Sequence, residues 1–182
     1  ASLRSSIVSH AKTLGYVPTS ARAAKAKVDV ILNTNDVNAT LPAGTVFNTT
    51  VNDISYQFST IADITKSNTG NTIPFVGVDI YEGSFITTRY TVDSSDIDQR
   101  FIITDNRADT TTLTVKVQTS STDSSSNTFT EATDITQVTA GSNVYFLQEV
   151  EAGLFEVYFG DGIIGTALSD ANIVLLQYVV SK

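Results

Sequence analysis

The sequence predicts a mainly β domain, an antiparallel sandwich or barrel-like fold with one short N-terminal helix. From Val28 onward, short β-branched and aromatic runs alternate with turn signals, which is typical of sandwiches and barrels. No helical patterns of roughly 10–15 residues alternate with these runs, so a parallel α/β sheet is disfavoured. Asp outnumbers Glu 14 to 5, and Asp favours turns whereas Glu favours helix interiors.

The N-terminal helix is expected over residues 2–14. Its apolar positions recur at spacings of four, four and three residues, which places them on one helical face. These positions are Leu3, Ile7, Ala11 and Leu14. Gly15 and Pro18 are strong stop signals. About a dozen residues are marginal as an isolated helix, so this one is expected to pack against something else.

Strand signals cover most of the remaining chain. Strands are expected at residues 28–32, 45–47, 54–58, 73–81, 85–92, 100–104, 112–117, 144–149, 154–159 and 173–180. The polar, low-complexity residues 119–128 predict a loop or hairpin tip, and residues 133–140 predict a helical turn or a β connection. The predicted organisation is a helix and linker over 1–27 and a β domain over 28–182, with an inserted subdomain over about 60–140 as an open alternative.

Composition excludes several kinds of chemistry. The chain of 182 residues has no cysteine and one histidine, His10, which excludes disulfides, thiolate catalysis and multi-histidine metal sites. The net charge of −8 disfavours nucleic-acid binding, which normally requires a basic surface. No apolar run approaches the roughly 18 residues of a membrane span, so we expect no integral membrane protein. We also expect no cofactor.

Residues 160–165 fit the dinucleotide-binding pattern G-x-G-x-x-G, but the context is wrong because no helix pattern follows. Gly160, Asp161 and Gly162 instead predict a structural turn, closing a hairpin between residues 154–159 and a returning strand.

Two acidic groups are candidates for other sites. Asp93, Asp96 and Asp98 resemble calcium ligands, but the spacing lacks the glycine and glutamate of an EF-hand, so a solvated turn is favoured. Three glutamates could mimic a glycosidase pair; these are Glu149, Glu151 and Glu156. Nothing else in the sequence is typical of a sugar cleft. The sequence therefore predicts no catalytic residue and no metal site.

The N-terminal segment is the candidate interface. Residues 1–28 carry five basic side chains and no acidic one, whereas the rest of the chain is acidic. This asymmetry favours a protein partner or a second copy of the chain over nucleic acid. The expected contact residues are Leu3, Arg4, Ile7, His10 and Leu14.

Several segments, read in order, resemble the baseplate wedge proteins of T-even-like contractile-tailed bacteriophages, a family related to baseplate protein J. They are residues 3–8 (LRSSIV), 15–24 (GYVPTSARAA), 41–47 (LPAGTVF), 155–165 (FEVYFGDGIIG) and 172–178 (NIVLLQY). The resemblance implies a structural virion protein with no catalytic residues. It also implies that the sequence is an internal fragment of a longer chain with helical segments before it.

What the resemblance implies about partners is equally specific. Family members join other wedge proteins around the tail hub and form a ring by homotypic contacts, so a homo-oligomer is expected. The expected location is the tail baseplate of the virion, assembled in the host cytoplasm from a late protein, without nucleic acid or membrane. The alternative is a receptor- or carbohydrate-binding β domain of a phage tail protein, although tryptophan, the preferred residue for stacking on sugars, is absent.

Overall fold

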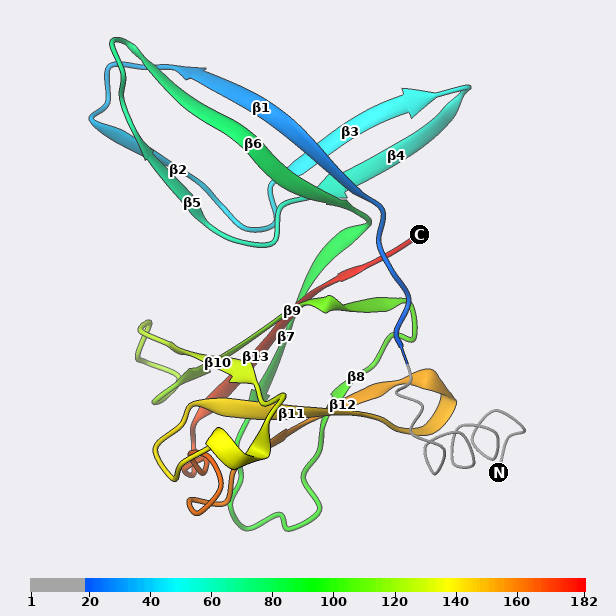
Figure 1. Cartoon of the computed structure of the whole chain (residues 1–182), viewed down its shortest axis with the longest axis vertical. Coiled ribbons are helices and arrows are strands. Elements are labelled where there is room, and N and C mark those ends of the chain that lie inside the picture. Colours follow the sequence, from blue (N-terminus) through cyan, green and yellow to red (C-terminus); the bar gives the residue numbers. More distant parts are fainter. Residues whose placement is uncertain (1–18) are drawn as a thin grey trace.

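The computed structural model describes residues 19–182, which are mainly β, as the sequence predicts. The strands form two lobes that meet at Gly83 (Figure 1). We call residues 25–82 the first lobe and residues 84–180 the second lobe. The predicted helix over residues 2–14 lies outside the described residues. Within those residues, helical structure is limited to two 3₁₀ turns, η1 (Ile135–Gln137) and η2 (Glu151–Gly153).

The first lobe contains a four-stranded sheet and a separate two-stranded pair. Its strands are β1 (Lys25–Asn33), β2 (Asn38–Leu41), β3 (Val46–Val51), β4 (Ile54–Ser59), β5 (Ile64–Ser67) and β6 (Thr72–Glu82). The order in the sheet is β1-β6-β4-β3, and β2 pairs with β5 alone. One face of the sheet covers the pair, because alternating side chains of β6 are buried between them. The fully buried members are Ile73, Phe75, Val78 and Ile80.

A β-bulge bends the first-lobe sheet near its middle. Val28 lies opposite Val78 and Val30 opposite Phe75, so Asp29 faces the two residues Val76 and Gly77. Gly77 has φ of +67°, a conformation that favours glycine. The Asp29 carboxylate accepts a hydrogen bond of 2.7 Å from the Gly77 N–H and thereby satisfies a donor that the ladder leaves out.

The second lobe is one seven-stranded sheet. Its strands are β7 (Ser84–Thr91), β8 (Phe101–Ile103), β9 (Ala108–Gln118), β10 (Asn127–Glu131), β11 (Val144–Glu149), β12 (Phe155–Phe159) and β13 (Ile173–Val180). The order is β7-β13-β9-β10-β11-β12-β8. All pairs are antiparallel except β10 with β11, which differs from the fully antiparallel expectation.

The seven-stranded sheet curls into a barrel-like lobe because its two edge strands meet through a side chain. The Tyr90 hydroxyl on β7 donates a 2.6 Å hydrogen bond to the Ile102 carbonyl on β8. The Tyr90 ring contacts Phe101 edge to face, and Phe159 and Phe129 continue the same arrangement inward. Burial raises the pKa of the Tyr90 hydroxyl, so it stays a donor. Around these rings lies a core much larger than that of the first lobe.

The second lobe also contains a bulge, and this one is buried. The segment Thr110–Leu113 of β9 lies opposite the single residue Tyr178 of β13. There the Thr112 hydroxyl takes the place of a ladder carbonyl and accepts a 2.9 Å hydrogen bond from the Val179 N–H. Both groups are inaccessible to water, so this side chain is essential to the ladder.

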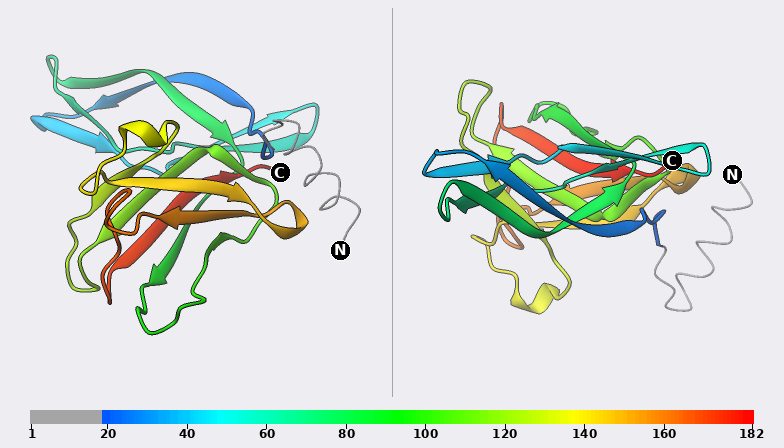
Figure 2. Two further views of the ribbon diagram at one scale, coloured as in Figure 1. Left: turned by 60° about the horizontal axis from the view of Figure 1, so that its bottom comes forward. Right: turned by 90° about the horizontal axis from the view of Figure 1, so that it is seen from above.

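The chain enters and leaves the first lobe at one point. The Glu82 N–H donates to the Ala24 carbonyl at 2.7 Å, so the incoming and outgoing strands are side by side. Just before Ala24, the Ala23 N–H donates to buried Asp109 of the second lobe at 3.0 Å. Both Figure 1 and the left view of Figure 2 place β1–β6 on one side of this point and β7–β13 on the other.

Several predicted elements differ from the structure. The strands β2, β5 and β10 were not expected, and β1 begins three residues before the predicted strand at residue 28. The predicted hairpin after residue 159 is wrong, because the next strand, β13, pairs with β7 and β9 and not with β12. The predicted domain boundaries stay a prediction, since a buried cluster does not show that a segment folds alone.

Candidate functional site

The buried carboxylate of Glu156 on β12 lies in a polar cluster of the second lobe. Glu156 is 3% exposed, and its Oε2 accepts hydrogen bonds from Arg100 Nε at 2.9 Å and from the Tyr158 hydroxyl at 3.0 Å. Arg100 Nη2 adds a second contact to the same oxygen. The Arg100 guanidinium lowers the pKa of the Glu156 carboxyl below its ordinary value, so the carboxylate stays ionised.

This arrangement does not provide a glycosidase pair. A general acid of that kind needs a raised pKa, whereas the pKa of Glu156 is lowered. Glu149 lies opposite Phe155 and Glu156 lies opposite Gln148, so the two glutamates point to opposite faces of the sheet. Glu151 lies in the turn η2.

The aspartates at 93, 96 and 98 form a turn between β7 and β8. The Asp93 carboxylate accepts hydrogen bonds from the N–H and the hydroxyl of Ser95 at 2.9 and 2.6 Å, and the Ser95 bonds lower the pKa of Asp93. The Asp96 carboxylate accepts from the Asp98 N–H at 3.0 Å. These are local turn contacts. Within residues 19–182, no group of three or more acidic, histidine or cysteine side chains is placed to hold a metal ion.

The glycine-rich residues 160–165 form a turn held by one side chain. Asp161 Oδ1 accepts from the N–H groups of Ile163 and Ile164, both at 2.9 Å, and these bonds lower the pKa of Asp161. The Gly162 N–H donates to the Gly165 carbonyl at 3.0 Å. A phosphate cradle needs such N–H groups free, and here they are used within the turn.

Only glycine fits at position 160, because the turn leaves no room for a side chain there. A Cβ placed there would lie 2.3 Å from the carbonyl carbon of Gly165, far closer than atoms can approach. Gly162 is required for its backbone conformation, because its φ is +86°, whereas a Cβ there would make only an ordinary contact of 3.7 Å with Ala167 Cβ. The five predicted interface residues, Leu3, Arg4, Ile7, His10 and Leu14, lie outside the described residues.

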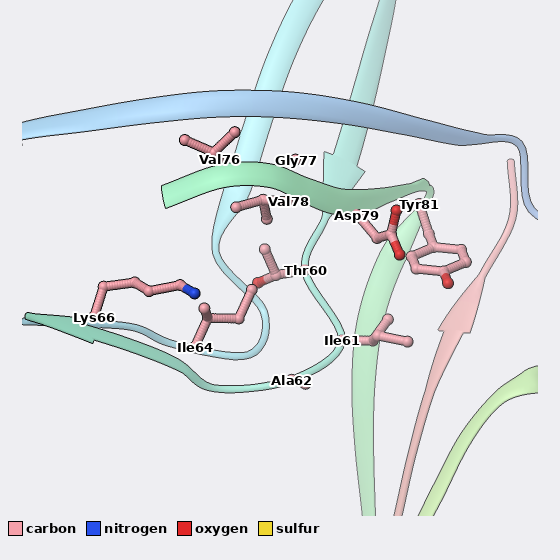
Figure 3. Close-up of a pocket in the computed structure, with 10 residues that line it drawn as sticks. All are labelled: Thr60, Ile61, Ala62, Ile64, Lys66, Val76, Gly77, Val78, Asp79 and Tyr81. Carbon is pink, nitrogen blue, oxygen red and sulfur yellow. The ribbon is translucent and has the colours of Figure 1, made fainter. Parts of the chain in front are cut away.

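A cavity of about 330 Å³ lies in the first lobe between β5 and β6 (Figure 3). It exists because β5 pairs only with β2, and β6 meets β4 only at Tyr81 and Glu82. The backbone edges of β5 and β6 therefore face each other without a strand between them. Apolar side chains line the gap: Ile61, Ala62, Ile64 and Val78. The side chain of Val76 points to the other side of β6 (Figure 3) and is 71% exposed.

The ends of the cavity are charged. Lys66 extends along one end (Figure 3), and its ammonium group forms no hydrogen bond or ion pair with the other described residues. Asp79 lies at the other end, where Lys27 and Lys25 approach its carboxylate oxygens at 2.8 and 2.9 Å. These hydrogen bonds lower the pKa of Asp79. Lys66 and Asp79 are the charged residues that line the cavity, and the ion pairs of Asp79 leave Lys66 as the lining charge without a partner among the described residues.

Some large apolar side chains outside the cavity are exposed to solvent. The most exposed is Ile97, at 94%, between Asp96 and Asp98 at the tip of the β7–β8 turn. Ile163 follows in the second lobe at 77%. The sequence does not predict the cavity, because its lining residues come from β5, β6 and the loop before β5, and β5 carries only a weak strand signal. The exposed Ile97 was missed as well. The isolated Ile within an acidic loop was the one available signal.

Residues 86–180 match a family model described as the third domain of the bacteriophage baseplate wedge protein gp6. The matched residues run from β7 to the end of β13, so they coincide with the second lobe and leave the first lobe out. No curated protein sequence matches the chain. No helix within the described residues is long and apolar enough to span a membrane.

Proposed function

The chain belongs to the family of the bacteriophage baseplate wedge protein gp6, and from this membership we propose that it works by protein–protein assembly, without catalysis. The family makes it a structural protein of the virion tail baseplate. Other wedge proteins are the proposed partners. The observation that carries the proposal is the family match, which spans the complete seven-stranded lobe, not an isolated motif.

A sheet face of the second lobe supports a role in binding proteins. Phe146 on β11 and Tyr158 on β12 lie side by side on the outer face of the sheet, where Tyr158 is 40% exposed. Arg100 lies next to them, with its side chain 51% exposed. Tyrosine and arginine are enriched among the residues that contribute most to protein interfaces. Glu156 accepts hydrogen bonds from Arg100 and Tyr158 and holds these two side chains in place before a partner binds. This reduces the entropy lost on binding.

The finer parts of the proposal rest on the sequence resemblance. We propose a T-even-like wedge protein related to baseplate protein J, present in several copies per baseplate and joined by homotypic contacts. As a late protein it would assemble in the host cytoplasm. The helix predicted over residues 2–14 remains the proposed docking element, with Leu3, Ile7 and Leu14 as its apolar contacts.

Co-purification tests the proposal. The tagged chain is added to the other wedge proteins encoded by the same phage genome, and the bound proteins are identified. We expect wedge proteins to bind, and Tyr158→Ala to weaken binding about tenfold. Tyr56→Ala in the first lobe is the matched control and should bind normally. Absence of any wedge partner, together with selective binding to a glycan array, would replace assembly by receptor binding.

A further inference from the structure

We propose that the cavity between β5 and β6 receives the β7–β8 turn of a second copy of the chain, with Ile97 as the inserted side chain. This inference rests on the proposed assembly function and names the surfaces of one homotypic contact. It connects two features that have no partner within a single copy. The first is the apolar cavity between β5 and β6, and the second is Ile97, which is almost fully exposed to water.

The chemistry of the two surfaces is complementary. The cavity has an apolar middle, and Lys66 at one end makes no polar contact with the described residues. The turn presents one apolar side chain, Ile97, between the carboxylates of Asp96 and Asp98. Asp79 at the other end is already paired with Lys25 and Lys27, so Lys66 is the lining charge that remains for the aspartates of the turn. An inserted Ile97 would leave water while a flanking carboxylate meets the Lys66 ammonium group.

The shape of the turn suits insertion. Its backbone is fixed by the carboxylates of Asp93 and Asp96, which accept hydrogen bonds from Ser95 and Asp98. Gln99 adds two more, accepting from the Asp93 N–H and donating to the Thr91 carbonyl. Ile97 is therefore held at the tip of an ordered turn, and little entropy is lost when it enters a pocket.

The contact cannot form within one copy. The β7–β8 turn lies at the end of the second lobe that is farthest from the first lobe (Figures 1 and 2). The cavity belongs to the first lobe. A contact between unlike ends of two copies is heterologous, and it generates a ring if the rotation closes. This geometry agrees with a protein present in several copies around an axis.

Disulfide trapping tests the contact, and the chain offers a clean background because it contains no cysteine. One batch carries Ala62→Cys at the cavity and a second carries Ile97→Cys. After mixing and mild oxidation, we expect a trapped dimer, because the bond requires Cβ atoms about 4 Å apart. The control pairs Ala62→Cys with Ile163→Cys, an equally apolar exposed loop position, and should give about tenfold less product. Equal yields from the two mixtures would overturn the proposal.

A mixing experiment tests the unlike ends. Ile97→Asp removes the inserted side chain but keeps the cavity, whereas Lys66→Glu spoils the cavity but keeps the turn. Each variant alone should associate about tenfold more weakly than the wild type in sedimentation analysis. Their mixture should form dimers that grow no further, since one working contact remains. Association that neither substitution weakens, or no association in the mixture, would overturn the inference.

The outcomes separate this inference from the proposed function. A trapped dimer in a chain that binds no wedge protein would leave the contact standing and contradict the function. Cross-linking of the Ala62→Cys chain to a different wedge protein, without a dimer, would support the function and assign the cavity to that protein. That second result would overturn the second-copy assignment.

Discussion

Both lobes are β structures, yet they differ in the size of their cores and in how many of their strand edges are left unpaired. The first lobe has four fully buried apolar side chains, an open cavity and unpaired edges on β5 and β6. The second lobe has twelve buried members in its core cluster, and its edge strands meet through Tyr90. Small cores are marginal, so the first lobe should gain more from contacts with another protein than the second. Only the second lobe matches the family model.

Removing a core side chain should give the largest difference between the lobes. Leu176 is fully buried in the second lobe, and Leu176→Ala should cost about 3 kcal/mol through lost burial and a residual cavity. Ile80→Ala is the matched change in the first lobe. We expect it to raise amide hydrogen exchange in β1 and β6 while β9 and β13 stay protected. Equal loss of protection in both lobes would mean that they unfold as one unit.

The junction between the lobes is the next test. Gly83 has φ of +125°, and a Cβ there would lie 2.2 Å from the Val180 carbonyl oxygen. Gly83→Ala should therefore cost roughly 2–3 kcal/mol. Gly141→Ala is the control, because nothing lies near that position. Urea denaturation measures both variants, and equal midpoints would show that the junction has room to adjust.

The two bulges give a matched pair of smaller changes. Thr112→Val keeps the shape of the side chain but leaves the buried Val179 N–H without an acceptor, which should cost about 2 kcal/mol. Asp29→Ala removes the acceptor of the Gly77 N–H in an exposed bulge, where water can replace it. That change should cost roughly 0.5 kcal/mol. Thermal denaturation measures both variants, and an equal loss of stability in the two would contradict this account.

The pH dependence of stability should report the Glu156 cluster. Because Arg100 lowers the pKa of Glu156 in the folded chain, the stabilisation is complete above the unfolded pKa of about 4.3. It is lost as the pH falls through the folded pKa. Near neutral pH the wild type should exceed Glu156→Gln by about 1 kcal/mol, since Arg100 is half exposed and solvent screens the pair. The gap should shrink toward pH 3, and a constant gap would contradict this account.

The last pair of variants lies in the 160–165 turn of the second lobe. Gly162 has positive φ, and a Cβ there would make only an ordinary contact with Ala167, so Gly162→Val should cost about 1 kcal/mol, mainly from backbone conformation. Gly160→Ala introduces a clash in place of backbone strain and should cost more. A reversed order in thermal denaturation would show that space matters less here than backbone conformation.

The sequence predicted the mainly β class and most second-lobe strands because these strands carry dense apolar or aromatic runs. Residues 144–149 and 173–180 were predicted with the observed bounds of β11 and β13. The strands β2 and β5 were missed because Asn38–Leu41 and Ile64–Ser67 are short and polar, and each is stabilised mainly by its partner. The bulge in β9 was also not predicted, since the hydrogen bond that Thr112 accepts from Val179 exists only because β13 lies next to β9.

The wrong hairpin has a similar cause. Gly160-Asp161-Gly162 has the local chemistry of a turn, and the structure forms a turn there. Local chemistry does not specify where the following strand pairs. Residues 173–180 are rich in apolar side chains on both faces, which suits a central strand between β7 and β9 better than an edge next to β12. The candidate site was missed because it depends on strand edges that only the assembled fold reveals.

The hydrogen bond between Glu82 and Ala24 has a consequence for the evolution of the molecule. Because the two strands that connect the lobes leave the same spot, side by side, the first lobe is attached like an insertion in a loop. Domain insertions are tolerated where the two ends of the inserted segment lie close together at a surface. We therefore expect relatives of this chain to differ in the length of residues 25–82 while the strands β7–β13 keep their order.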